Sequence, residues 1–363
     1  MIGWNAFVLL AAVNLAPSPP ATMAAPPTPE QVMAVPPELR QQLQERVIDA
    51  TNAPEQRLQR IVDLVFKPDG LGLQYDTTAT LTVAETWEQH RANCLSFTLL
   101  FVALAREAGL EARIQEVGQV VTWYQEQGVI YNAGHVNVGL RVAGRHGTLD
   151  LDQNVLYDRR GPRVISDQRA LAHYYNNRGA ELMATHDAEA MEYLRTALRM
   201  DPAFAPAWNN LGVLERRRGD ARAAALAFDN ALRAHPALLS ALSNATSMYR
   251  QLGDTRRAAQ LGERLQRARD RDPFYQFMQG VEAERRGDYA QATAAYRHAI
   301  RLYGNAHQFH FGLARAYFLQ GENQRAMREM ARARELGGTD QVRAVYQAKL
   351  DSLHRINARQ IPR

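Results

Sequence analysis

The chain is poor in cysteine and in lysine. Its 363 residues include one cysteine, so no intramolecular disulfide can form and no zinc site built on several cysteines exists. Only Lys67 and Lys349 are lysines, so arginine supplies nearly all of the 43 basic residues and most of the net charge of +5. Because lysine-rich runs and basic stripes interleaved with aromatics are missing, we expect no nucleic acid partner. Arginine pairs well with carboxylates, which leaves acidic partners open.

Long apolar runs are also missing, apart from a short one at the N-terminus. Residues 6–16 are apolar, and small residues follow before a Pro-rich stretch, as in a secretory signal with its cleavage region. We therefore expect a signal peptide over residues 1–25, export to the periplasm or cell envelope, and no transmembrane span in the mature chain. No basic residue precedes the run, so a cytoplasmic location is the alternative.

The composition predicts two domains joined to a short linker. The apolar fraction of 46% and the charged fraction of 22% are typical of soluble globular proteins, and the length exceeds one ordinary core. Residues 17–36 are rich in Pro and Ala and predict a disordered linker, of which 26–36 would remain after cleavage.

Residues 37–165 predict an α+β domain. Apolar residues recur at helical spacing over 39–48 and 58–65, and 92–109 form a strongly apolar third helix. Strand-like segments follow near 112–124, 134–142 and 145–152, with turns expected at Gly128 and Gly144. Helices followed by hairpins are typical of the α+β class.

The rest of the chain is predicted to be helical with an internal period. Gly219, Gly253, Gly287 and Gly321 are each 34 residues apart, and acidic and alanine positions repeat with them. This period and these small residues resemble the tetratricopeptide repeat. We expect five repeats over 171–340, stacked as a solenoid, and a C-terminal capping helix and tail over 341–363.

Cys94 opens the third helix, which is where a cysteine nucleophile is best placed. A helix N-terminus offers partial positive charge and free N–H groups, and both stabilise a thiolate. The same groups could hold a developing oxyanion. A lone cysteine is more often a small buried hydrophobe, so a base has to lie nearby.

His135 begins a predicted strand and is the candidate base. If Ala143 and Gly144 form a two-residue turn, Asp150 lies opposite Asn137 and Asp152 lies opposite His135. All four polar residues then share one face, and a carboxylate can orient the imidazole. Asp150 and Asp152 both remain candidates for that carboxylate.

The spacing of these residues resembles the transglutaminase-like, or papain-like, superfamily. The resemblance covers about residues 40–160: a cysteine opening a helix that ends in Gly109-Leu110-Glu111-Ala112-Arg113, a histidine on a strand, and an aspartate 15 residues later. It implies Cys94 as nucleophile, His135 as base and Asp150 as orienting carboxylate, without a metal or cofactor. Asn93 and Gln89 are candidate oxyanion donors by proximity. The sequence departs from the family's usual Gly before the cysteine and its Trp after the histidine.

Stacked repeats present a concave groove, which we expect to bind a protein or peptide. Its candidate residues, by repeat register, are Asn209, Arg216, Arg250, Phe277, Arg285 and Arg315. Two functions follow: a cysteine-dependent amidase, peptidase or transglutaminase-like enzyme acting on a protein or a peptidoglycan peptide, or a non-catalytic exported adaptor that only binds partners.

Overall fold

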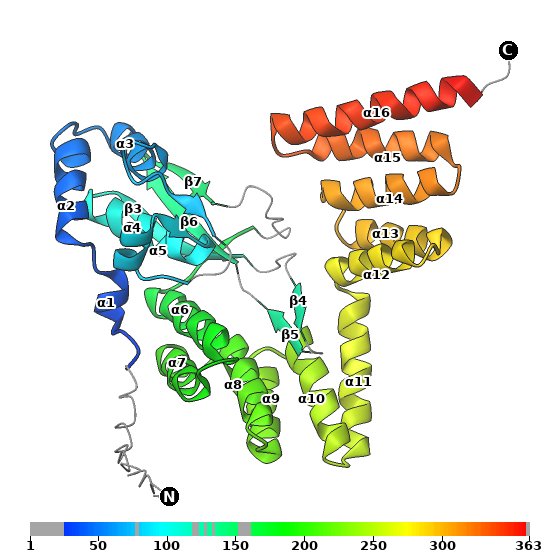
Figure 1. The fold of residues 1–363 in the computed structure, drawn as a ribbon, viewed down its shortest axis with the longest axis horizontal. Coiled ribbons are helices and arrows are strands. Elements are labelled where there is room, and N and C mark those ends of the chain that lie inside the picture. Colours follow the sequence, from blue (N-terminus) through cyan, green and yellow to red (C-terminus); the bar gives the residue numbers. More distant parts are fainter. Residues whose placement is uncertain are drawn as a thin grey trace, which may run out of the picture.

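The structure is a computed structural model. It has an α/β unit at the N-terminal end, which is followed along the chain by a helical array (Figure 1). It describes residues 25–76, 80–117, 123–126, 129–132, 135–151 and 161–360. The expected signal peptide therefore lies almost wholly outside the described residues. None of the helices within those ranges combines the length and the apolarity that a bilayer span requires.

The described residues of the N-terminal unit contain six helical segments. They are α1 (Pro29–Met33), α2 (Pro37–Leu43), the π-helical turn η1 (Gln44–Ile48), α3 (Pro54–Phe66), α4 (Val83–Gln89) and α5 (Cys94–Glu107). Almost every side chain of α5 is buried, so this helix forms the centre of the unit. A helix that is apolar on all sides is stable only when other elements surround it.

The strands form one larger and two small sheets. The strands are β1 (Gln74–Tyr75), β2 (Arg91–Ala92), β3 (Glu111–Val117), β4 (Trp123–Glu126), β5 (Val129–Asn132), β6 (His135–Val142), β7 (Arg145–Leu149) and β8 (Arg163–Val164). The larger sheet has the order β7-β6-β3-β8 and is antiparallel, while β1 pairs with β2 and β4 pairs with β5. Helix α5 packs on β6 and β3, which brings its N-terminus to the sheet.

The β6–β7 connection is the two-residue turn that the sequence predicts. Val142 pairs with Arg145, and both Ala143 and Gly144 have positive φ, at 49° and 77°. Two positive φ values match the right-handed twist of the flanking strands. This turn fixes the register, with Val138 opposite Leu149.

The segment predicted as a disordered linker is partly ordered. Thr28 caps α1 with a reciprocal capping box, and Val32 and Val35 are buried in the core. The Tyr175 hydroxyl also donates to the Pro27 carbonyl at 2.6 Å. Proline at the first helical position suits a helix start, so the Pro content that suggested disorder instead fits a cap.

The array consists of helices that pack in sequential pairs. They are α6 (Asp167–Leu182), α7 (Asp187–Met200), α8 (Ala205–Arg217), α9 (Ala221–Ala234), α10 (Leu239–Gln251), α11 (Thr255–Asp270), α12 (Pro273–Arg285), α13 (Tyr289–Leu302), α14 (His307–Leu319), α15 (Asn323–Leu336) and α16 (Asp340–Gln360). Helix α6 packs with α7, α8 with α9, and so on to α14 with α15, and α16 covers α15.

The predicted Gly-Asp turns are confirmed within this array. Gly219, Gly253, Gly287 and Gly321 all have φ between 78° and 86°. In three of the four turns the next residue is an aspartate whose side chain accepts from the first turn of the following helix. The repeating pair thus ends one helix and caps the next.

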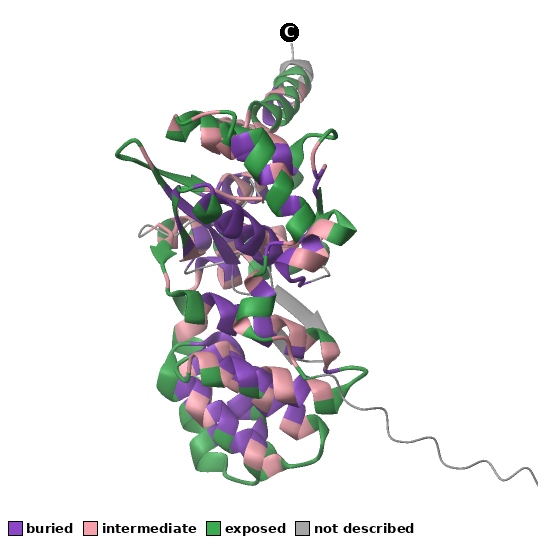
Figure 2. Ribbon diagram, turned by 90° about the vertical axis from the view of Figure 1, so that its left-hand side faces the viewer, coloured by how far each residue is buried: buried purple, intermediate pink, exposed green. Residues whose placement is uncertain are grey.

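Buried residues fill the interior of both units (Figure 2). The core of the N-terminal unit continues into the first helices of the array and includes Tyr174, Tyr175 and Phe204. The array itself has one core cluster over α6–α11 and others over α12–α16.

Candidate active site

Cys94 is the first residue of α5 and is half-buried. Asn93 caps the helix: its side chain accepts from the Ser96 N–H at 2.9 Å, and its carbonyl accepts from the Phe97 N–H at 3.0 Å. Within the described residues, the N–H groups of Cys94 and Leu95 have no such acceptor. The sulfur therefore lies at a helix end that still has free donors.

Tyr75 is a neighbour of the sulfur that the sequence did not predict. The parallel pairing of β1 with β2 sets Tyr75 beside Ala92, and its hydroxyl lies 3.7 Å from Cys94 Sγ. Because β1 has only two residues and no alternating pattern, this pairing leaves no signal in the sequence.

His135 lies at the start of β6, where it pairs with Val117, and its side chain is 5% exposed. Thr98 ties this strand to α5, because its hydroxyl is 2.7 Å from the Cys94 carbonyl oxygen and 3.3 Å from that of Val136. The helix that carries the sulfur and the strand that carries the imidazole are therefore held together next to both groups.

Asp150 directly follows the last residue of β7. Its Oδ2 lies 2.7 Å from His135 Nε2 and accepts from Asn137 Nδ2 at 3.1 Å. The pairing of Val138 with Leu149 places Asp150 at the level of Asn137, as the predicted turn requires. Asp152, the alternative carboxylate, lies outside the described residues.

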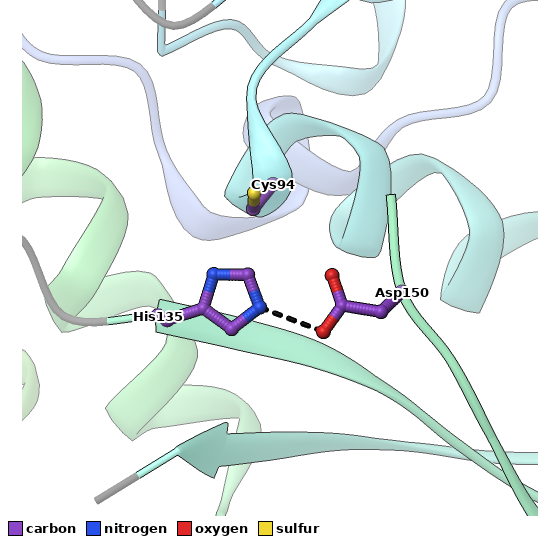
Figure 3. A group of neighbouring side chains, drawn as sticks. All are labelled: Cys94, His135 and Asp150. Carbon is purple, nitrogen blue, oxygen red and sulfur yellow. Dashed lines mark hydrogen bonds and ion pairs between the residues drawn. The ribbon is translucent and has the colours of Figure 1, made fainter. Parts of the chain in front are cut away.

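The three candidate side chains converge (Figure 3). Figure 3 shows one ring nitrogen of His135 directed at Asp150, and the ring edge with the other nitrogen facing the sulfur. The ligand-type atoms of Cys94, His135 and Asp150 all lie within 4.8 Å of one another. Three residues far apart in sequence thus form one thiol–imidazole–carboxylate chain.

The surroundings of His135 favour a charged ring. Burial by itself lowers the pKa of His135, but hydrogen bonds to Asp150 and Cys94 and the negative charges of both groups raise the pKa to about 9. The ring is then protonated at neutral pH, and a protonated imidazole beside a thiol favours the thiolate.

A cysteine, a histidine and a carboxylate are also possible metal ligands. Here, however, Asp150 and Cys94 face different nitrogens of the same imidazole (Figure 3). One ion can coordinate only one nitrogen of a ring, so it cannot replace both contacts. The geometry fits a hydrogen-bonded chain better than a coordination sphere.

The two candidate oxyanion side chains have other contacts. Asn93 Nδ2 donates to Thr80 Oγ1 at 3.0 Å, and its oxygen caps α5. Gln89 is exposed at the end of α4, and its oxygen accepts from Arg91 at 2.8 Å. Among the described residues neither side chain forms a hydrogen bond with Cys94. The two free N–H groups are instead those of Cys94 itself and of Leu95.

The candidate groove residues fall into two groups. Asn209 is 2% exposed and accepts from Asn244 Nδ2 at 3.0 Å, and Phe277 packs on Phe309 at 4.9 Å between ring centroids. These two belong to contacts between repeats. Arg315 donates to Glu284 at 3.0 Å. The remaining arginines, in α8, α10 and α12, have no carboxylate partner among the described residues: Arg216, Arg250 and Arg285.

The hairpin β4–β5 lies between the site and the array. It connects β3 to His135 along the chain, and β5 packs against α10 and α8 (Figure 1). Helices α8 and α10 are the first helices of their pairs, so part of this face of the array is covered by the chain itself. The sequence analysis did not predict this contact.

Family models match both parts of the chain. Residues 41–139 match the transglutaminase-like superfamily, a range that contains Cys94 and His135 and ends before Asp150. Residues 188–238 and 277–340 match the tetratricopeptide repeat. The stretch between these two ranges includes α10 and α11, where Gly262 stands at a position that the repeat usually fills with a large residue.

Several solved structures are similar in fold to the array. The Cut9-Hcn1 hetero-tetramer of the APC/C is 19% identical, with a TM-score of 0.29; the match covers 52% of this chain and 37% of that chain. A thermophilic TPR protein of Thermus thermophilus is 19% identical, with a TM-score of 0.28, covering 49% and 98%. MamA is 16% identical, with a TM-score of 0.26, covering 46% and 91%.

The search of curated proteins gave no match. The family models and the architecture nevertheless agree on the order of the two parts. The chain therefore carries a transglutaminase-like domain followed by tetratricopeptide repeats.

Proposed function

We propose that the protein catalyses cysteine-dependent acyl transfer on an amide, as a hydrolase or a transglutaminase-like enzyme. One observation carries the proposal: Cys94 at a helix N-terminus and Asp150 flank the same buried imidazole, that of His135. A thiolate, a proton donor and an orienting carboxylate are the three groups that this chemistry needs.

In the proposed reaction the Cys94 thiolate attacks the carbonyl carbon of the amide. The carbonyl oxygen becomes an oxyanion, which the N–H groups of Cys94 and Leu95 are placed to receive. The C–N bond then breaks as His135 passes its proton to the leaving amine. The products are a free amine and a thioester on Cys94.

Water or a second amine resolves the thioester. His135, now neutral, takes a proton from the incoming nucleophile as it attacks, and the thiolate leaves and regains its protonated partner. Asp150 holds the ring with Nε2 toward the carboxylate, so the other nitrogen stays directed at the sulfur throughout.

The reactivity of the thiol tests the proposal, and Cys94 is the only cysteine that can be labelled. At pH 6 we expect iodoacetamide to label the wild-type protein at least about tenfold faster than His135→Ala, because an ordinary thiol is almost fully protonated there. The rate is followed by mass spectrometry of the intact protein. Asp150→Asn should lie between the two.

The control is His146→Ala, which removes an exposed histidine from the adjacent strand β7 and should leave labelling unchanged. A wild-type profile like that of a free thiol, unaffected by His135→Ala, would instead support the adaptor function. In that case the N-terminal domain and the repeats act only by binding.

The repeat array makes binding of a protein partner plausible. We propose that an acidic or C-terminal peptide segment docks beside the arginines without a carboxylate partner, Arg216, Arg250 and Arg285, and presents the partner to the N-terminal domain. We also propose export to the periplasm or cell envelope. Mass spectrometry of the mature N-terminus tests this: cleavage near residue 25 supports export, and an intact Met1 contradicts it.

A further inference from the structure

A second face of the array contains a basic cleft that the proposed reaction does not use. The cleft has a volume of about 400 Å³ and lies between α13, α14 and α15. Four arginines line it, and apolar groups of Ile300, Leu313 and Tyr317 complete the lining. The arginines are Arg297 and Arg301 from α13 and Arg325 and Arg328 from α15.

Most of the positive charge in this cleft is uncompensated. Arg325 pairs with Glu322 at 2.6 Å, and the one acidic lining residue, Glu329, already contacts His310 Nδ1 at 2.7 Å. The other three arginines of the cleft have no carboxylate within ion-pair distance in the part of the chain that the structure describes. Some arginines elsewhere in the array are paired, as Arg257 is with Asp229, so what distinguishes the cleft is that its arginines converge on one hollow.

The spacing of these arginines makes the charge costly without a ligand. Arg297 and Arg301 are four residues apart on α13, and Arg325 and Arg328 are three apart on α15. Like charges at these spacings share a helix face and repel each other. A bound anion between the two helices would offset this repulsion.

The cleft is separate from the face that carries the candidate groove arginines. Helices α13 and α15 are the second members of their pairs, whereas Arg285 and Arg315 belong to the first members, α12 and α14. Adjacent second helices therefore form the walls, and α14 contributes Leu313 and Tyr317 between them.

We propose that this cleft binds an acidic peptide segment that carries an apolar side chain between its carboxylates. Planar guanidinium groups bind carboxylates through two parallel hydrogen bonds, and Ile300, the half-buried apolar residue of the lining, suits an aliphatic side chain. A nucleic acid fits less well: Tyr317 is only 7% exposed, and Arg325 already lies over its ring, so no aromatic face is open for base stacking.

Fluorescence anisotropy with a labelled peptide in which glutamates flank a central leucine tests the proposal. The variant Arg301→Glu/Arg328→Glu should weaken binding at least about tenfold, because it replaces two attractive charges by two that repel the peptide's carboxylates. Arg222→Glu/Arg256→Glu makes the same change in net charge on the second helices α9 and α11, and it should change binding less than about twofold.

Two further peptides and two further protein variants sharpen the result. Glutamine in place of the glutamates should abolish binding, and alanine in place of the leucine should weaken it. Should the charge reversal disturb folding, as judged by circular dichroism, Arg301→Gln/Arg328→Gln must still weaken binding. Cys94→Ala must bind normally, so failure here is independent of the proposed reaction.

Three outcomes would overturn the proposal. Equal losses in both double variants would show a nonspecific charge effect. A loss only in Arg216→Glu/Arg250→Glu would move the peptide to the other face of the array. If inorganic phosphate binds in the cleft and the peptide has no measurable affinity for it, the cleft is a phosphate site.

Discussion

At the residue scale, His135 is the group whose protonation links the candidate site to folding. Its side chain is almost fully buried, yet its contacts with Asp150 and Cys94 raise the pKa to about 9, above the value of about 6.5 for an unfolded chain. The folded protein therefore binds a proton more tightly than the unfolded protein does. The stability that results is fully present below about pH 6.5 and is lost as the pH rises through about 9.

Replacing His135 should expose this dependence. In a Cys94→Ala background, where no thiol titrates in the same range, we expect His135→Gln to lower the free energy of unfolding more at pH 6 than at pH 10, because Asp150 favours the charged ring. Urea unfolding of both proteins at the two pH values measures it. A deficit of the same size at pH 6 and pH 10 would mean that the ring is neutral in the folded protein.

Single residues at the site were predicted to different degrees. The alternation of side chains along strands placed His135 and Asp150 on one face, and the β6–β7 turn bears that out. Tyr75 was missed because its strand has two residues and pairs in parallel with a distant segment. Asp150, the carboxylate next to His135, lies just beyond the end of β7, where strand pairing no longer fixes the backbone.

At the element scale, two mid-helix glycines test the repeat packing against each other. A Cβ on Gly212 of α8 would lie 2.5 Å from the buried Phe228 ring, whereas a Cβ on Gly262 of α11 would meet only Thr246 at 3.9 Å. The first glycine is thus required by a close helix approach and the second is not.

The corresponding alanine variants should therefore move in opposite directions. Gly212→Ala should lose about 1 to 3 kcal/mol through overpacking. Gly262→Ala should gain up to about 1 kcal/mol, because alanine is the better helix former. Chemical denaturation of the full chain measures both; a stabilising Gly212→Ala would show that α8 and α9 are less tightly packed than the structure indicates.

At the scale of the whole molecule, an ionic network joins the sheet to the array. Glu116 of β3 contacts His173 at 2.9 Å and Arg169 at 3.0 Å, and Arg169 also pairs with Asp201 at 2.7 Å. Burial raises the pKa of Glu116, but the His173 and Arg169 contacts outweigh it and hold the pKa well below its usual range. Arg169 and His173 also lie against the Phe204 ring.

Removing the negative charge of Glu116 should weaken the contact between the sheet and the array. We expect Glu116→Gln to lower the free energy of unfolding by about 2 to 3 kcal/mol, since it removes the carboxylate that both His173 and Arg169 contact and leaves Arg169 with Asp201 alone. Glu111→Gln is the matched control: it lies on the same strand, but its ion pairs are exposed, so it should cost less than about 1 kcal/mol. If both variants lose the same free energy of unfolding, the network around Glu116 stabilises the protein no more than the exposed ion pairs of Glu111 do.

The sequence by itself determined the elements whose causes are local. The 34-residue period, the Gly-Asp turns, the cysteine at a helix start and the Ala143-Gly144 turn all depend on neighbours in the chain, and each is present in the structure. The same local reasoning failed for α1, because its order depends on burying Val32 and Val35 against residues far along the chain.

Only the tertiary structure decided which distant groups meet. It brought Tyr75 to the sulfur, joined the sheet to α6 through Glu116, placed β5 on α8 and α10, and collected arginines from two helices around one cleft. The first three of these contacts join segments that no periodicity relates, whereas α13 and α15 are related by the repeat but their arginines are not. Their free energy comes from burial and charge pairing across the chain, which a local pattern does not encode.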